Sequence, residues 1–326
     1  MGGRGGRLGR LLGVAAGPTV ALLAAAAVAA GATRISVGTG SAGGVYFFVG
    51  TALTTLLNKH IPGMNATPEP VTGSAHALKL LHAGDLTIAL VELGSAYFGV
   101  RGQREFDRKY DQVGFVMAGM DTGQSLVTWA EGPIRSFGDV RGKRLASNSP
   151  ASRAQLLAVL RLYGIAEGDV QHKYLNYSEQ MAALRDGSID AGFFAVSPRN
   201  ANVMDLASGR GVRILGLDPA RARAFAESYP YWTPTTIRAG TYPRQDEDLL
   251  VPALYTTLLA HRGADPALVY EIVRTVIERG REFGELHPGG REFTIDKTRH
   301  FVERNLLPVG FHPGAERFWR EKGVVK

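Results

Sequence analysis

Cysteine is absent from the chain, and its absence removes several kinds of chemistry at once. Without cysteine there is no disulfide, no thiolate metal site, no cysteine nucleophile and no lipid-modified cysteine at a mature N-terminus. Basic residues are scattered along the sequence, so the chain also lacks the continuous basic stretch that a nucleic-acid groove requires. We therefore expect no nucleic-acid partner.

Catalytic motifs are missing as well. The sequence has no Gly-Lys-Ser/Thr, which excludes a nucleoside-triphosphate P-loop, and no Gly-x-Ser-x-Gly turn that would present a nucleophilic serine. Its eight histidines are dispersed, without the His-Glu-x-x-His spacing of a zinc site. Hydroxyls and backbone amides without an acid–base pair can hold a ligand but offer no evident means to transform it. We therefore predict a binding protein rather than an enzyme, with no catalytic residue, metal or cofactor.

The N-terminus is typical of an export signal. Three arginines lie within the first ten residues, residues 11–29 are apolar, and small residues up to Ala32 offer a cleavage point. The alternative is an uncleaved membrane anchor, because this apolar run is long enough to cross a bilayer. Three of the 37 lysine and arginine residues lie in this segment, so 34 remain against 30 acidic residues. We expect a mildly basic mature protein in the periplasm, suited to an acidic small molecule.

A glycine-rich loop follows this leader. Residues 35–37 predict a short strand, residues 38–44 form the loop, and apolar residues from Val45 to Leu57 recur at helical spacing. A strand that leads through a glycine loop into a helix leaves unpaired backbone N–H groups. Such N–H groups can hold an anion, so this loop is the first candidate for ligand binding.

The glycines at positions 38, 40 and 43 also fit the Gly-x-Gly-x-x-Gly pattern of a dinucleotide site. Such a site requires an acidic residue about twenty positions further on, near the end of the next strand. Here that region holds Asn58, Lys59 and His60, and Glu69 comes late, between prolines. We therefore expect the loop to hold a captured solute rather than a cofactor.

The chain carries a faint internal duplication. Residues 77–92 give an apolar helix end, a Gly-Asp turn and a buried strand, and residues 180–196 repeat this pattern. A strand-loop-helix unit precedes each copy, at residues 35–50 and 142–164. We therefore predict an α/β fold with two lobes, each a mainly parallel sheet covered by helices, rather than one large doubly wound sheet.

Two largely apolar segments, residues 113–130 and 248–262, are placed to cross between the lobes, and residues 229–249 predict an ordered loop. Ligands bind outside the carboxyl ends of strands in open α/β sheets, so two facing lobes would place their polar loops in one cleft. The predicted domains are a signal peptide, a discontinuous lobe I and an inserted lobe II: residues 1–32, residues 33–124 with 250–326, and residues 125–249.

Polar residues at the strand ends are the candidate ligand contacts. Thr72 and Ser74 precede a predicted helix, so they can cap it and also face a ligand, and capping alone is the alternative for Ser74. Among the aromatic residues we favour Tyr46 and Phe194 as walls of the cleft. The remaining candidates are loop hydroxyls and one amide: Ser41, Ser147, Asn148, Ser149 and Ser152.

Six segments carry a resemblance to a known family, in this order: GTGSAGGVYFFVGTALTTLLNKHIPG, VTGSAHALKLLHAGDLTIALVE, SFGDVRGKRLA, YSEQMAALRDGSIDAGFF, YPYWTPTTIRAGTYPRQDED and HPGAERFWRE. They resemble the TAXI family, the extracytoplasmic solute-binding proteins of TRAP transporters. The resemblance implies a type II periplasmic-binding-protein fold, in which two hinged lobes close on a ligand. It also implies delivery to an ion-coupled membrane permease, and acidic ligands such as glutamate-like amino acids, dicarboxylates or oxo-acids.

The resemblance further implies which residues contact the ligand. Relatives usually carry Val-Gln-Ser-Asp where this chain has Val91 followed by Glu92, so Glu92 would repel a carboxylate. Arg153 or Arg199 would attract one through a forked contact, or else lie at the surface. Residues 148–153 form a shorter loop than in relatives, which bears on the ligand more than on the fold. The family's first-lobe contacts fall on Thr39, Gly43, Gly44, Val45, Tyr46, Thr72, Gly73 and Ser74.

Three functions remain in view at this point. We expect a monomeric solute-binding protein that captures an acidic solute and delivers it to TRAP permease subunits. The first alternative is a periplasmic sensory or accessory protein that acts on a membrane receptor or kinase. The second is an exported hydrolase, which requires an acid–base pair that the sequence does not offer.

Overall fold

The computed structural model describes residues 2, 33–229 and 231–326. The predicted signal peptide therefore lies outside the described residues, apart from Gly2. Across the described ranges, no helix combines the length and the apolar character needed to cross a membrane.

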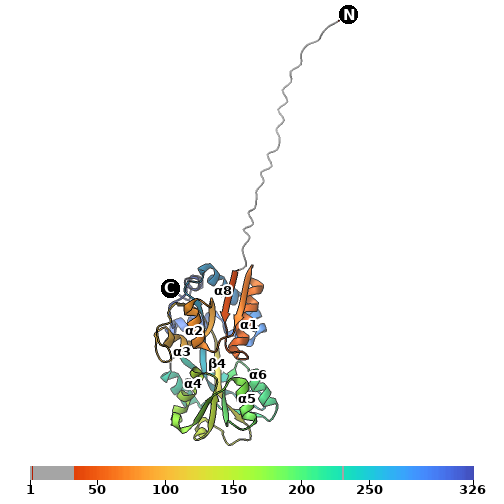
Figure 1. Cartoon of the computed structure of the whole chain (residues 1–326), viewed down its shortest axis with the longest axis vertical. Coiled ribbons are helices and arrows are strands. Elements are labelled where there is room, and N and C mark those ends of the chain that lie inside the picture. Colours follow the sequence, from red (N-terminus) through yellow and green to blue (C-terminus); the bar gives the residue numbers. More distant parts are fainter. Residues whose placement is uncertain (1, 3–32, 230) are drawn as a thin grey trace. The chain divides into compact units, whose positions relative to one another are not determined.

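Strands and helices alternate through most of the chain, and a group of helices follows the last strand (Figure 1). The strands are β1 Thr33–Gly38, β2 Met64–Glu69, β3 Ile88–Glu92, β4 Val113–Trp129, β5 Arg144–Ser147, β6 Gln171–Tyr174, β7 Ala191–Ser197, β8 Val212–Ile214, β9 Trp232–Ile237 and β10 Leu249–His261. The helices are α1 Val45–His60, α2 Ser74–Ala83, α3 Leu93–Gly99, α4 Pro150–Arg161, α5 Tyr177–Arg185, α6 Ala201–Ser208, α7 Pro219–Ser228, α8 Pro266–Glu278, α9 Gly280–Leu286, α10 Ile295–Glu303 and α11 Pro313–Glu321.

The internal duplication corresponds to two similar sets of parallel strands. In one set β1 pairs in parallel with β2 and β3, and in the other β5 pairs in parallel with β6 and β7. Strand β3 then pairs antiparallel with β10, and β7 pairs antiparallel with β4. The two long strands β4 and β10 pair with each other, so the hydrogen-bonded path is continuous in the order β2-β1-β3-β10-β4-β7-β5-β6.

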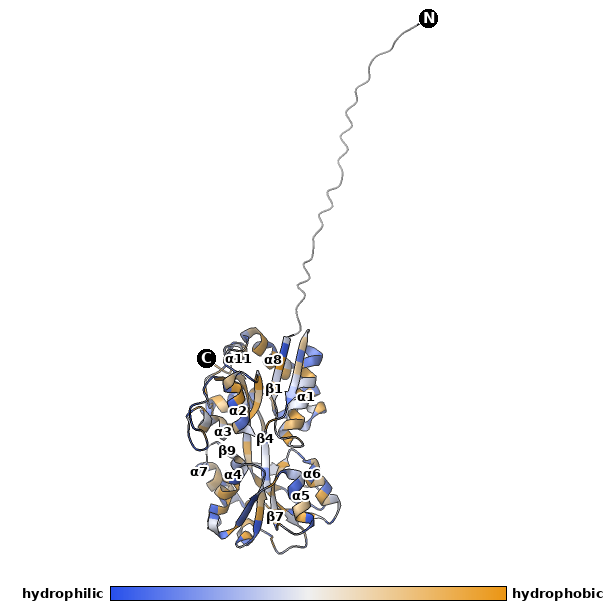
Figure 2. Cartoon of the chain, viewed as in Figure 1, coloured by the Kyte–Doolittle hydropathy of each residue, from blue (hydrophilic) through white to orange (hydrophobic). Residues whose placement is uncertain are grey.

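The hydrophobic cores divide into two groups. Two clusters draw their buried residues from residues 35–120 and 255–324, with Ala195 as the exception. Two further clusters draw theirs from residues 126–254. We call these parts the first half and the second half. In Figure 1, α1, α2 and α8 cover one end of the molecule and α4, α5 and α6 cover the other, with β4 running between them. Hydrophobic residues gather along the strands between the covering helices (Figure 2).

Residues 229–249 differ from the ordered loop that their composition predicts, because they contain β9. Strand β9 pairs antiparallel with the first part of β10, with Pro234 opposite Pro252. Proline lacks an N–H and is confined to strand edges, so its presence argued against a strand here. The pairing is tolerated because β9 lies off the main path of the sheet, as an edge strand.

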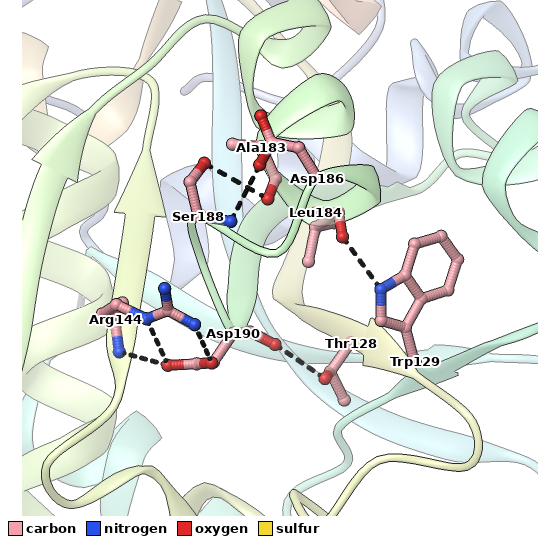
Figure 3. A network of polar contacts seen from close by, with 8 residues as sticks. All are labelled: Thr128, Trp129, Arg144, Ala183, Leu184, Asp186, Ser188 and Asp190. Carbon is pink, nitrogen blue, oxygen red and sulfur yellow. Dashed lines mark hydrogen bonds and ion pairs between the residues drawn. The ribbon is translucent and has the colours of Figure 1, made fainter.

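A polar network in the second half fixes the turn before β7 (Figure 3). The guanidinium of Arg144 donates to both carboxylate oxygens of Asp190, at 3.1 and 2.6 Å, and these bonds lower the pKa of Asp190. Thr128 Oγ1 donates to the Asp190 carbonyl at 2.8 Å, and Trp129 Nε1 donates to the Leu184 carbonyl at 3.0 Å. These bonds tie β4, β5 and β7 together within the second half.

Candidate functional site

A cavity of about 90 Å³ lies where loops of the two halves meet. It is situated at the carboxyl ends of β1, β3 and β5, the place where open α/β sheets bind ligands. Its walls combine glycines, hydroxyl groups, one amide from each of two segments and two tyrosines. The lining residues are Gly40, Ser41, Gly44, Val45, Tyr46, Thr72, Gly73, Ser74, Glu92, Thr122, Gln124, Asn148, Ser149, Ala151, Ser152, Tyr177, Ala195 and Leu254.

Two helices of the first half begin at this cavity with glycine caps. Gly44 precedes α1 and Gly73 precedes α2, and neither supplies a side-chain acceptor for the first N–H groups of its helix. Gly73 has a φ of 152°, a conformation that other residues rarely adopt. The first N–H groups of α1 and α2 are therefore left for another acceptor, and the positive ends of both helix dipoles favour an anion there.

The second half contributes helices that carry their own caps. Ser149 Oγ accepts the N–H of Ser152 at 3.2 Å at the start of α4. Asn176 caps α5 by accepting the N–H of Glu179 at 3.0 Å. At the cavity the start of α4 presents the side chains of Asn148, Ser149 and Ser152 and α5 presents Tyr177, so the second half offers fewer free backbone donors than the first half.

Two tyrosines wall the cavity from opposite halves. The hydroxyl of Tyr46 forms a 2.7 Å hydrogen bond with Thr256 Oγ1, and burial raises the pKa of Tyr46 well above its usual range. Tyr177 stacks on Phe194 with ring centroids 5.5 Å apart, and burial raises the pKa of Tyr177 to about 12. Both phenols therefore stay neutral at physiological pH and serve as walls and hydrogen-bonding groups rather than as charges.

Glu92 lines the cavity, but its carboxylate serves mainly as a cap. It accepts the N–H groups of Gly94 and Ser95 at 2.7 Å each, at the start of α3, and the indole N–H of Trp232 at 3.1 Å. A side chain at position 94 would come within 2.8 Å of the Glu92 carboxylate, so glycine is required for this close approach. The Glu92 N–H donates to Ser74 Oγ at 3.0 Å. Burial raises the pKa of Glu92, with these hydrogen bonds acting in the opposite direction.

Two lining residues come from the middle of β4, a segment that the sequence predicts only as a crossing between the lobes. Thr122 is 3% exposed and Gln124 is 6% exposed. Sequence spacing places both side chains on the same face of the strand, because side chains alternate between faces. The sequence does carry a signal for them: residues 121–125 are polar or glycine, although the rest of the segment 113–130 is largely apolar.

Most of the predicted contacts line the cavity, and four do not. Thr39 Oγ1 donates to the Glu69 carbonyl at 3.1 Å, and Gly43 lies in the loop without lining the cavity. Ser147 is fully buried and its hydroxyl forms a 2.8 Å hydrogen bond with His172 Nε2. Phe194 is fully buried behind Tyr177, so it supports the wall without forming it. The predicted residues that do line the cavity are Ser41, Gly44, Val45, Tyr46, Thr72, Gly73, Ser74, Glu92, Asn148, Ser149 and Ser152.

Neither arginine considered as a partner for a carboxylate reaches the cavity. Arg153 forms an ion pair with Glu167, and Arg199 is not among the lining residues. The described residues that line the cavity include no lysine, arginine or histidine. A neighbouring hollow of about 440 Å³ shares the residues 72–74 with the cavity and adds His76, Lys79 and Glu105. The side chain of Lys79 therefore lies in the neighbouring hollow rather than in the cavity itself.

Comparison with known proteins gives one family and several similar structures. The model of the NMT1-like family matches residues 37–323. MatC from Rhodopseudomonas palustris with bound malate has a TM-score of 0.59 and 16% identity, covering 90% of this chain and 99% of that one. SsuA from Xanthomonas axonopodis pv. citri bound to MOPS has a TM-score of 0.53 and 16% identity, covering 90% of this chain and 85% of that one. The aliphatic sulphonate binding protein SsuA from Escherichia coli has a TM-score of 0.50 and 16% identity, with coverage of 88% and 82%. The predicted fold class, that of type II periplasmic binding proteins, is thereby confirmed.

Proposed function

The chain belongs to the NMT1-like family, and from this premise we propose that it is an extracytoplasmic solute-binding protein. It captures a small acidic solute, of the class that includes glutamate-like amino acids, dicarboxylates and oxo-acids. It delivers this solute as a monomer to the membrane subunits of a TRAP-type, ion-coupled permease. The observation that carries the proposal is the cavity between the halves, at which the uncapped starts of α1 and α2 meet hydroxyls of the second half.

The chemistry of the cavity supports binding over catalysis. A general acid or base must be able to exchange a proton with a bound molecule. Glu92 is occupied by three N–H donors of the chain, and burial keeps Tyr46 and Tyr177 protonated. Serine hydroxyls line the cavity without a histidine among the described lining residues. The solute is therefore held unchanged.

The fold supports a mechanism in which two lobes close on the ligand. We propose lobe I as residues 33–124 with 250–326 and lobe II as residues 125–249, with β4 and β10 as the connections that bend. Two similar structures hold malate and MOPS, molecules that carry a carboxylate and a sulfonate, respectively. An anionic group at the starts of α1 and α2 is the corresponding arrangement here. The N-terminal leader, cleaved near Ala32, places the protein in the periplasm.

The test begins with whatever solute the cell supplies. Mass spectrometry of the small molecules released from the purified protein should identify an organic acid, and calorimetry with that acid should then give one site per chain. Deletion of the gene should abolish uptake of the labelled acid only in cells that carry a TRAP permease. A protein that releases no small molecule and binds none of the amino acids, dicarboxylates and oxo-acids offered to it refutes the proposal.

A further inference from the structure

The floor of the cavity is formed by three adjacent strands, and its polar groups come from β4 alone. Thr122 lies opposite Leu254 of β10, and Gln124 lies opposite Ala195 of β7. All four residues line the cavity. Because Leu254 and Ala195 are apolar, a ligand that rests on this floor meets only the hydroxyl of Thr122 and the amide of Gln124.

The buried oxygen of Thr122 makes no hydrogen bond of good geometry to a described residue; its neighbour is the Tyr46 hydroxyl, and this contact acts to lower the pKa of Tyr46 against the larger effect of burial. The neighbouring phenol of Tyr46 is already bonded to Thr256. A buried polar group without a well-placed partner needs an explanation, and Thr122 differs from the other such groups among the described residues, such as Gln155 and His312, in lining the cavity. The hydroxyl of Thr122 is therefore independent of the helix starts as evidence for a ligand, and it can pair with a ligand atom that donates or one that accepts a hydrogen bond.

Gln124 is held at one end only. Ser152 Oγ is 3.2 Å from Gln124 Oε1 and 2.7 Å from Asn148 Oδ1, and its single hydrogen serves one of these two oxygens. Gln124 lines the cavity, and the other end of its amide forms no hydrogen bond with a described residue. A hydroxyl group on the ligand suits either orientation of this amide, because it is both a donor and an acceptor.

An ammonium group finds neutral acceptors on this floor but no free carboxylate to compensate its charge. Glu92 is the single carboxylate among the described lining residues, and its two oxygens already accept three N–H groups. The positive ends of α1 and α2 repel a cation. An α-amino acid would therefore place its ammonium charge in a cavity whose other acceptors are uncharged hydroxyl and amide oxygens.

We propose that Thr122 and Gln124 are the specificity-determining residues of this site, and that they select a hydroxy acid over the amino acid of the same skeleton. The carboxylate of the ligand lies at the starts of α1 and α2, and its hydroxyl lies on the floor. This inference rests on the proposed function, and it narrows the acidic solutes named there to those with a neutral oxygen substituent.

Calorimetry with matched acids tests the inference directly. The probes are lactate and alanine, malate and aspartate, and 2-hydroxyglutarate and glutamate, whose members differ only at C2. In whichever pair binds, the hydroxy acid should bind at least about tenfold more tightly, because the ammonium charge of the amino acid lies near the positive ends of α1 and α2 without a free carboxylate. An amino acid that binds equally well or better overturns the inference while the proposed function stands. If no pair binds, the inference fails, whereas the proposed function is decided separately by the released small molecule and by the wider panel that includes oxo-acids and other dicarboxylates.

A substitution of similar volume gives a second test, which measures the ligand affinity and also the melting temperature of the unliganded protein. Thr122→Val should reduce the affinity for the hydroxy acid about tenfold, and the unliganded protein should melt at the same temperature or higher because a buried unpaired hydroxyl is removed. Thr128→Val is the matched control on the same strand, since Thr128 bonds to the Asp190 carbonyl at 2.8 Å and does not line the cavity (Figure 3). Thr128→Val should lower the melting temperature and leave the affinity unchanged. A Thr122→Val variant that loses as much stability as Thr128→Val shows that the Thr122 hydroxyl is already paired, and overturns the inference.

Discussion

Replacing Trp232 by phenylalanine should weaken both the fold and ligand binding, because the indole joins the two halves. Trp232 belongs to a core cluster of the second half, and its Nε1–H donates to Glu92 Oε1 at 3.1 Å. Trp232 is 5% exposed and Glu92 is 4% exposed, so water cannot replace the lost donor easily. A hydrogen bond to a charged acceptor contributes about 1.5–3 kcal/mol, and this one is long enough to fall near the lower limit.

The magnitude follows from what phenylalanine keeps and what it loses. Phenylalanine can preserve the stack on Phe225, whose ring lies 5.8 Å from the indole at an interplanar angle of 7°. It loses the N–H donor and part of the ring volume, so we expect the free energy of unfolding to fall by about 2–3 kcal/mol. The bond joins the halves around the cavity, so its loss should also weaken ligand binding. We expect the free energy of binding to fall by about 1.5 kcal/mol, which is a roughly tenfold rise in the ligand Kd. Urea denaturation and calorimetry measure the two effects separately.

The chain offers a matched control in Trp129. Its Nε1–H donates to the Leu184 carbonyl at 3.0 Å, and both residues lie in the second half (Figure 3). Trp129→Phe should therefore cost about 1 kcal/mol of stability and leave the ligand Kd unchanged. If Trp232→Phe destabilises the protein but binds ligand as tightly as Trp129→Phe does, the bond to Glu92 plays no part in closing the halves, and the reasoning fails.

Three further predictions concern α1 and the pH dependence of stability. Gly44→Ala should raise the ligand Kd about tenfold in calorimetry with little loss of stability. The reason is that the added Cβ would lie at the start of α1, 3.1 Å from the Ser41 carbonyl. An unchanged Kd would show that this helix start does not belong to the site. Burial lowers the pKa of His172 to about 4. The unfolded chain therefore binds a proton more readily than the folded protein, and the free energy of unfolding should fall by about 2 kcal/mol as pH falls from about 6.5 towards 4. The denaturation midpoint of His172→Asn should change less over this range. Burial raises the pKa of Glu292, so the protein should lose stability as pH rises through this raised pKa and the buried carboxyl group becomes charged. Glu292→Gln should therefore become more stable relative to the wild type at higher pH. A difference between the two melting temperatures that stays constant with pH would contradict this.

The repeated pattern of helix end, glycine turn and buried strand was enough to predict the fold class. The turn at Gly84 ends α2 with a φ of 85°, and Gly187 has a φ of 75° before β7, so both copies depend on glycine at the same point. Sequence periodicity detects such units because each is local. Strand β9 was missed because Pro234 and the threonines around it resemble a loop, and only its pairing with β10 makes it a strand. That pairing is set by a segment further along the chain.

The candidate site was predictable where it lies in loops and not where it lies on strands. Residues such as Ser41, Thr72 and Ser149 follow strand ends, and they line the cavity. On a strand, neighbouring residues face opposite sides, so a shift of one position reverses the assignment. Phe194 was predicted as a wall, whereas Ala195 beside it lines the cavity and Phe194 packs in a core cluster. Deciding between such neighbours requires the register of the sheet, which a single sequence does not supply.

The two halves contribute different chemistry to the cavity, and the difference arises from how their helices begin. In the first half glycine caps leave the N–H groups of α1 and α2 without a side-chain acceptor, so this half is suited to hold an anion before closure. In the second half Ser149 and Asn176 satisfy their own helix starts, so this half presents hydroxyls and amides that can only complete a site already occupied. Binding should therefore begin at the first half, and closure should depend on a ligand whose remaining polar groups match β4. On the proposed function, we expect the ligand to be selected in two steps, by charge at the glycine caps and then by hydrogen bonding on the floor.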